Sequence, residues 1–157
     1  MKDKHKFNCT GIWFFGLAGS GKTFASSIIG HQTKKSYLID GHEVRKLISC
    51  DLGYSKHDRD IQLNRLFGIA NLTIKNGFFP VVASVSMQKI VLEKCNMLGI
   101  RVIKIERSFE QISRVRSIYK SSENVVGKDL FLDELETTVL FNDGTSEFAS
   151  LIKSLVR

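Results

Sequence analysis

The sequence predicts an α/β fold in which a parallel sheet of about five strands lies between two layers of helices. The first observation is that short apolar segments alternate with segments of helical periodicity. The second is that these apolar segments resemble strands buried on both faces, which is typical of parallel sheets. The predicted strands are 11–16, 36–40, 81–86 and 101–106, with 138–141 as a fifth candidate. The predicted helices are 23–31, 43–49, 59–76, 88–98, 109–120 and 146–156.

Length and composition indicate one domain over residues 1–157. The chain has 157 residues, of which 43% are hydrophobic and 25% charged, as in ordinary globular proteins. Its three cysteines are widely spaced, so the sequence favours free thiols over a disulfide framework or a zinc site. Free thiols suit a reducing compartment, and no apolar run is long enough to span a bilayer. We therefore expect a cytoplasmic protein without membrane contact.

The net charge of +7 narrows the class of partner. Both nucleic acids and phosphorylated small molecules attract a basic protein. The sequence shows no RNP motif, no helix-turn-helix and no basic pattern interleaved with aromatic residues. We therefore expect a small-molecule ligand and no nucleic acid.

Residues 16–23 form the complete G-x-x-x-x-G-K-[ST] pattern of a phosphate-binding P-loop. An apolar strand precedes the motif and a helical segment follows it, as the motif requires. Backbone N–H groups in such a loop point at phosphate oxygens, Lys22 adds charge near the β- and γ-phosphates, and the Thr23 hydroxyl suits Mg²⁺. The motif predicts the three-layer P-loop NTPase sandwich and a site for ATP and Mg²⁺ built from Gly16, Leu17, Ala18, Gly19, Ser20, Gly21, Lys22 and Thr23.

Asp40 ends the second predicted strand and is followed by Gly41, which permits a sharp turn. Ligands of open parallel sheets bind at the carboxyl ends of the strands, so Asp40 is expected to face the P-loop. There it would accept a proton from an attacking hydroxyl or hold Mg²⁺ through water. The alternative is that Asp40 only caps the helix that follows.

Residues 51–59 carry a second polar cluster. Ser55 or Asp58 is expected to cap the long helix that follows. Tyr54 would stack on a base and Arg59 would bind a phosphate. The alternative makes Tyr54 a core aromatic and Arg59 a solvated residue at the start of the helix.

Further polar residues follow two later strands. Ser84 and Ser86 lie at the end of the third strand, and Arg107 follows the fourth. Residues 121–129 are polar and predict a mobile loop. For Arg107, Arg114 and Arg116 the alternative to a role at the site is a solvated helix face.

The order of these motifs resembles that of adenylylsulfate (APS) kinases. The resemblance covers about residues 12–130 and rests on the P-loop, on Asp-Gly-x-x-x-Arg at 40–45 and on Asp-Leu-Gly-aromatic-Ser-x-x-Asp-Arg at 51–59. It implies a P-loop kinase that transfers the γ-phosphate of MgATP to a ribose 3′-hydroxyl. The acceptor is a nucleotide whose 5′-phosphate carries a sulfate anhydride. Because APS kinases are often dimers, the resemblance also implies a homodimer.

The resemblance assigns a role to each motif residue. Asp40 would be the catalytic base with Lys22 beside it, and Arg114 would belong to the ATP site. A segment around 114–130 would form a lid, whose Arg114 and Arg116 would close over the phosphates. The acceptor site would comprise Asp40, His42, Arg45, Tyr54, Arg59, Gln62, Ser84, Val85, Ser86, Arg116, Val126, Gly127 and Lys128.

Departures from the family pattern cluster on the acceptor side. His42 stands where APS kinases usually have a second Asp, and the usual Asn-Ile-Arg-Arg reads Gln-Leu-Asn-Arg at 62–65. The usual Phe-Thr-Gly of the lid reads Val-Val-Gly at 125–127, which removes an aromatic face worth about 1–3 kcal/mol of stacking.

These departures favour a kinase of the same reaction type with a different acceptor. Relatives that phosphorylate cytidine 5′-diphosphoramidate, in the modification of capsular polysaccharide, fit because a pyrimidine needs less stacking area and a phosphoramidate is tetrahedral and anionic like sulfate. An APS kinase is the first alternative. A non-catalytic nucleotide-binding module is the second, and Asp40 argues against it. A GTPase would need an N/T-K-x-D motif, which the sequence lacks.

Overall fold

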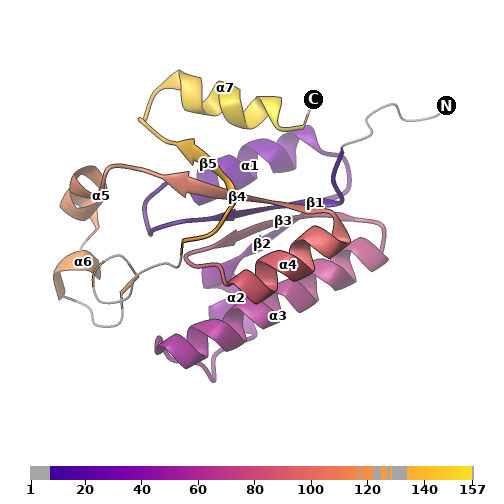
Figure 1. Ribbon diagram of the computed structural model, residues 1–157, viewed down its shortest axis with the longest axis horizontal. Coiled ribbons are helices and arrows are strands. Elements are labelled where there is room, and N and C mark those ends of the chain that lie inside the picture. The colour runs from indigo at the N-terminus through magenta and orange to yellow at the C-terminus, as the bar shows by residue number, and fades with distance from the viewer. Residues whose placement is uncertain (1–7, 117, 122–124, 127, 129–133, 157) are drawn as a thin grey trace.

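The computed structural model describes residues 8–116, 118–121, 125–126, 128 and 134–156 (Figure 1). These residues form a sheet in the order β2-β3-β1-β4-β5, and every neighbouring pair is parallel. The strands are β1 (Gly11–Phe15), β2 (Ser36–Asp40), β3 (Phe79–Ser84), β4 (Ile100–Glu106) and β5 (Thr138–Phe141). The predicted five-stranded parallel sheet is therefore confirmed.

Helices cover both faces of the sheet. The structure contains α1 (Lys22–Gln32), α2 (Gly41–Leu47), α3 (Lys56–Lys75), α4 (Lys89–Leu98), α5 (Phe109–Val115), α6 (Ile118–Ser121) and α7 (Ser146–Ser154). Figure 1 shows α1 and α7 on one face, and α3 and α4 on the other. None of these helices is both long and apolar enough to cross a bilayer.

The central strand β1 explains why the sheet needs both layers. Ile12 and Phe14 belong to the core under α1 and α7, whereas Trp13 and Phe15 belong to the core under α3 and α4. All four side chains are at most 1% exposed. Successive residues of a strand point to opposite faces, so a continuous apolar run fills both cores at once.

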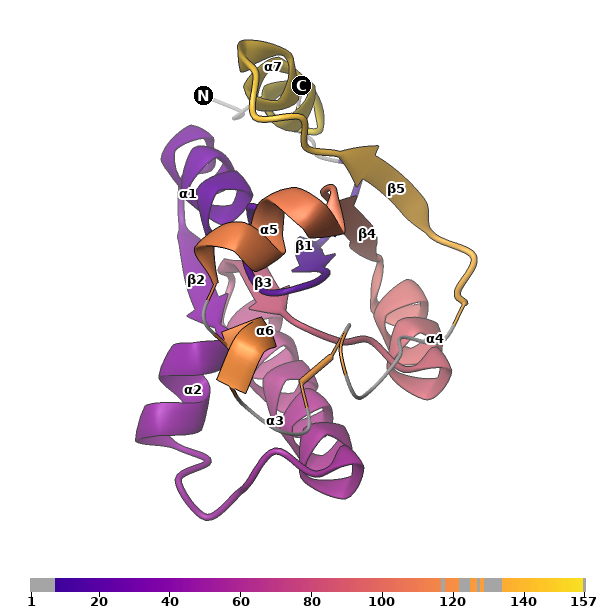
Figure 2. The same ribbon diagram turned by 90° about the vertical axis from the view of Figure 1, so that its left-hand side faces the viewer.

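One predicted helix, 109–120, is divided in the structure. Arg116 has extended backbone (φ −110°, ψ 103°) and separates α5 from α6. The break folds the chain back, so that the rings of Phe109 and Tyr119 meet edge-on with centroids 5.3 Å apart. In a continuous helix, residues this far apart would be separated by about 15 Å along the axis. Figure 2 shows both helices at the carboxyl end of the sheet.

Candidate active site

A cavity of about 440 Å³ lies at the carboxyl end of the sheet, within the size range of small-molecule sites. It adjoins the P-loop between β1 and α1, the ends of β2 and β3, the connection from α2 to α3, and the lid. The structure brings together there these predicted site residues: Ala18, Gly19, Gly21, Lys22, Thr23, Asp40, His42, Arg45, Tyr54, Arg59, Gln62, Ser84, Val85, Ser86 and Arg116.

The P-loop has a backbone that only glycine tolerates at three positions. Gly16, Gly19 and Gly21 have φ angles of 150°, 88° and 110°. A Cβ atom at Gly16 would collide with the carbonyl oxygen of Ile105, and one at Gly21 with the amide of Asn142. The loop therefore packs tightly against the ends of β4 and β5. It leads into the N-terminus of α1, where helix N–H groups favour anions.

Four consecutive carbonyl oxygens of the loop, those of residues 17–20, each accept a hydrogen bond from a side chain. The donors, in that order, are Lys22 Nζ at 2.8 Å, the Tyr119 hydroxyl at 2.9 Å, Arg107 Nη1 at 3.4 Å and Asn142 Nδ2 at 2.8 Å. With its carbonyl groups held in this way, the loop keeps N–H groups for an anion. Gly16, Leu17 and Ser20 shape the loop without lining the cavity.

Lys22 is the most perturbed charge of the site. Its side chain lies at the cavity but is only 8% exposed. Burial lowers the pKa of the Lys22 ammonium to about 8; the carboxylate of Asp40 opposes this shift, and the guanidinium of Arg116 reinforces it. A bound phosphate would place a negative charge beside this buried ammonium and so stabilise its charged form.

Asp40 both caps a helix and faces the cavity. Its Oδ1 accepts hydrogen bonds from the backbone N–H groups of His42 at 2.8 Å and Glu43 at 3.4 Å, at the N-terminus of α2. Gly41 is required beside it, because a Cβ there would lie 2.9 Å from the carbonyl oxygen of Ala83. The cap predicted as an alternative is therefore present, and it fixes the carboxylate at the cavity wall.

Two arginines flank Tyr54 on the far side of the cavity. The guanidinium carbons of Arg45 and Arg59 lie 4.8 and 5.6 Å from the centroid of the Tyr54 ring. Arg45 also donates to the carbonyl of Gly53, and Arg59 Nε to that of Tyr54 at 3.2 Å. Burial and the charge of Arg45 lower the pKa of Arg59. Because Tyr54 is 54% exposed, its interpretation as a core aromatic is wrong.

Neighbouring elements set the position of this second wall. Ser55 accepts a hydrogen bond from the N–H of Asp58 at 3.1 Å and caps α3, as predicted. Gln62 Nε2 donates to the carbonyl of Gly41 at 3.0 Å, while its buried Oε1 has no partner. Ser84 accepts from Trp13 Nε1 at 2.8 Å and donates to the carbonyl of Ser86.

The lid residues divide into three groups. Arg116 lines the cavity, and its Cγ atom would lie 3.2 Å from a Cβ at Gly19. Arg114 does not line it: this residue is exposed on α5 and pairs with Glu110 one helical turn away, in contrast to the predicted role at the ATP site. Val126 is buried and Lys128 exposed, both away from the cavity lining; Gly127 lies outside the described residues.

The site residues predicted from the sequence omit six residues of the cavity wall: Phe24, Gly41, Leu63, Leu66, Ala83 and Arg107. Phe24, next to the P-loop on α1, lines the cavity and stacks on Phe148 of α7 at 6.3 Å. Arg107 follows β4 and lines the cavity beside Gly19. The strand-end position of Arg107 was the available signal for that residue, and the i,i+4 spacing of Glu110 and Arg114 was one for their exposed ion pair.

The residues present suit a magnesium nucleotide better than a metal held by protein alone. No group of three His, Cys, Asp or Glu side chains with metal-binding proximity occurs in the described part of the chain. Mg²⁺ normally keeps water and takes few protein ligands together with substrate phosphates. Thr23 and Asp40 both line the cavity and carry the oxygen atoms that such a site would use.

The comparisons with known proteins agree on one family. Residues 8–106 match the family model described as adenylylsulphate kinase. The adenylyl-sulfate kinase of Picosynechococcus sp. is 33% identical over 87 residues, which are 53% of this chain and 49% of the relative. That of Staphylococcus epidermidis is 31% identical over 105 residues, 64% of this chain and 50% of the relative. The chain thus spans about half the length of these curated relatives.

Solved structures show the same fold over nearly the whole chain. The Mycobacterium tuberculosis APS kinase in complex with AMPPNP and APS has a TM-score of 0.81 and 20% identity, over 94% of this chain and 97% of that one. The crystal structure of APE1195 has a TM-score of 0.72 and 22% identity, over 98% and 100%. Because the family model covers more than half of the sequence, this protein belongs to the adenylylsulphate kinase family.

Proposed function

We propose that this protein is an ATP-dependent kinase that phosphorylates the ribose 3′-hydroxyl of a nucleotide carrying a 5′-phosphate anhydride. The observation that carries this proposal is that Lys22, Thr23 and Asp40 line one cavity together with an arginine-rich wall. A P-loop and a strand-end carboxylate are the parts that phosphoryl transfer needs: positioning, charge neutralisation and a base.

Each residue has a defined task in the proposed reaction. Asp40 accepts the proton of the 3′-hydroxyl, whose oxygen forms a bond to the γ-phosphorus as the bond to the β–γ bridging oxygen breaks and ADP leaves. Lys22 neutralises charge on the transferred group, and Arg45 and Arg59 hold the acceptor's 5′ groups. Mg²⁺ would be held by Thr23 and, through water, by Asp40, and it would neutralise charge on the phosphates.

The favoured acceptor is cytidine 5′-diphosphoramidate. Tyr54 is the aromatic residue that the acceptor wall offers to a base. Val125, which replaces the lid phenylalanine of the family pattern, packs in a cluster with Ile112 and Tyr119 instead of lining the cavity. A single ring suits a pyrimidine better than adenine, and His42 changes the charge next to Asp40.

The alternative acceptor is APS, as in an enzyme that makes PAPS during sulfate assimilation. It is favoured by the matched relatives, which are named adenylyl-sulfate kinases. Arg45 and Arg59 would serve a sulfate anhydride as readily as a phosphoramidate, since both groups are tetrahedral anions. The two acceptors therefore differ mainly in the base that Tyr54 meets.

The test is ADP release from purified protein with MgATP and one acceptor at a time: cytidine 5′-diphosphoramidate, CDP as its control, and APS. Turnover with the cytidine compound alone supports the favoured acceptor. Turnover with APS would make APS the acceptor instead. If no compound raises turnover above the acceptor-free rate, the proposed function is contradicted. Asp40→Asn serves as the catalytically impaired control in every arm.

A further inference from the structure

We propose that Arg107 binds the phosphates of the donor nucleotide. This cation lies outside the P-loop and is positioned by the sheet. The inference deepens the proposed function, because it takes the P-loop as the donor site. No motif in the sequence assigns this role: Arg107 precedes the lid and lies between the segments that carry the family pattern.

The position of Arg107 follows from the register of the sheet. Strand β4 is hydrogen-bonded to β1, and Lys104 pairs with Phe15, the last residue before the P-loop begins. Arg107 is the first residue after β4, so it emerges beside the loop from a rigid element. Its Nη1 lies 3.4 Å from the carbonyl oxygen of Gly19, and its side chain lines the same cavity as Lys22.

The hydrogen bonding of Arg107 is incomplete. A guanidinium has five N–H donors, whereas the bond to Gly19 is longer than the usual 2.7–3.2 Å for N–H···O. The Nε of Arg107 is buried without a partner, and no acidic side chain among the described residues forms a salt bridge with it. Buried donors without partners are unfavourable, and phosphate oxygens are the acceptors that a guanidinium fork fits best.

The strand order places Arg107 on the donor side of the cavity. Strands β4 and β5 lie on one side of β1, and β3 and β2 lie on the other. Asp40 ends β2, and Arg45 and Tyr54 follow it. Arg107 instead follows β4, and its Nη2 approaches Gly144, in the connection from β5 to α7. The P-loop lies between the two groups, so Arg107 faces the donor's phosphates rather than the acceptor.

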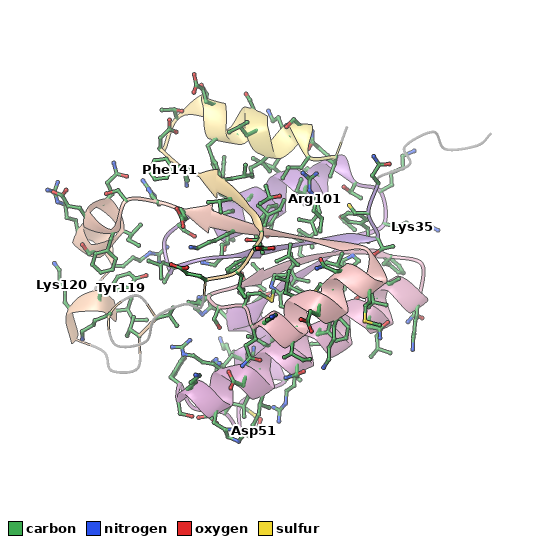
Figure 3. All side chains as sticks on the ribbon, viewed as in Figure 1. Lys35, Asp51, Arg101, Tyr119, Lys120 and Phe141 are labelled. Atoms are coloured by element: carbon green, nitrogen blue, oxygen red, sulfur yellow. The ribbon has the colours of Figure 1, made fainter. Side chains whose placement is uncertain are left out.

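A purely structural role is the competing explanation, since Arg107 also donates to Gly19. Arg107→Gln keeps a neutral donor for that carbonyl and removes the charge, whereas Arg107→Lys keeps the charge and removes the planar fork. Arg101 provides the matched control: it is an exposed arginine near the start of β4, at the opposite end of the sheet from Tyr119 of the lid (Figure 3).

The experiment measures the dissociation constant of MgADP by calorimetry for the wild type, Arg107→Gln, Arg107→Lys and Arg101→Gln, with the melting temperature of each nucleotide-free protein. We expect Arg107→Gln to bind MgADP about ten- to a hundred-fold more weakly, Arg107→Lys to recover part of this loss, and Arg101→Gln to bind like the wild type. The ligand-free melting temperatures of the two Arg107 variants should agree, because both keep a donor for Gly19.

Three results would overturn the inference, and they are distinguishable. Wild-type affinity for MgADP in Arg107→Gln removes the proposed contact while leaving the kinase proposal intact. If the affinity of Arg107→Gln for MgADP falls only to the extent that its melting temperature falls, Arg107 has a structural role. A wild-type protein that binds no MgADP removes the proposed function and, with it, this inference.

Discussion

The carboxylate of Asp40 illustrates how one side chain serves both the fold and the site. It accepts two backbone hydrogen bonds at the start of α2 and lines the cavity opposite the P-loop. Capping and proton transfer make different demands on the residue, because a cap needs an acceptor oxygen and a base needs a titratable one. A substitution that keeps the oxygen and removes the proton affinity separates the two roles.

Asp40→Asn tests this separation. We expect the stability of the protein to change by less than about 0.5 kcal/mol, since Asn caps helices as well as Asp, while turnover falls about 10²–10⁴-fold. Urea denaturation and ADP release measure the two effects. If turnover stays near that of the wild type with saturating MgATP, Asp40 is not the base.

Lys22 makes the stability of the ligand-free protein depend on pH. Its pKa is about 8 in the folded protein and 10.5 as its ordinary value, so below pH 8 the ammonium carries its desolvation cost in full. As pH rises from 8 to 10.5, the folded state releases this proton before the unfolded state does, and stability increases relative to a chain without Lys22.

Lys22→Met should therefore raise the free energy of unfolding by about 1–3 kcal/mol at pH 7, with the gain shrinking towards pH 10.5. Turnover should be lost at every pH, since the charge near the γ-phosphate is gone. Urea titrations of the wild type and the variant across this range provide the measurement, with the exposed Lys46→Met as control. A difference between wild type and variant that does not vary with pH would contradict the assigned pKa.

The segment predicted to act as a lid packs against the P-loop, which is distant from it in the sequence. Ile112 of α5, Tyr119 of α6 and Val125 form a buried cluster against Leu17 and Ala18 of the P-loop. The cluster is small and separate from the two main cores. Its stability should therefore control closure of the site without controlling the fold.

Ile112→Ala is expected to loosen the lid while the sheet stays intact. Removing the buried side chain should cost about 2–4 kcal/mol locally, and hydrogen exchange should accelerate in 109–121 far more than in β1 or β3. The ratio of ATP hydrolysis without acceptor to phosphoryl transfer should rise, since a loose lid admits water. Uniform acceleration across the sheet would show instead that the lid and the core unfold together.

At the scale of the whole molecule, positive charge converges on the cavity. Lys22, Arg45, Arg59, Arg107 and Arg116 line it, and Asp40 is the one carboxylate among the lining residues described. Low-dielectric walls concentrate this field and favour a polyanionic ligand. The overall charge of +7 is thus partly a property of the site.

Nucleotide affinity should accordingly depend on ionic strength. We expect MgADP to bind several-fold more weakly at 0.5 M than at 0.05 M KCl, because the Debye length falls from about 14 to about 4 Å. Arg116→Gln should show a shallower dependence than the wild type, and Lys46→Met an unchanged one. Equal affinities at both salt concentrations would show that these cations do not face the ligand.

The sequence by itself determined the parallel sheet, the P-loop and the end of β2 at Asp40, because each depends on local patterns: apolar periodicity, glycines at fixed spacing and a polar residue at a strand end. It also placed Tyr54 and Arg59 in the site through their order along the chain, although the exposure of Tyr54 required the fold.

Only the tertiary structure decided which arginines meet the P-loop. Arg107 stands at the end of the fourth strand and Arg114 lies in the helix that follows, and neither sequence context shows which side chain reaches the loop. The register of β4 against β1 brings Arg107 beside Gly19, whereas Arg114 is exposed on α5 and pairs with Glu110 one helical turn before it. The position of Arg107 depends on contacts between segments distant in the chain, as does the bond from Tyr119 to Ala18, and such contacts leave no periodic signal in the sequence.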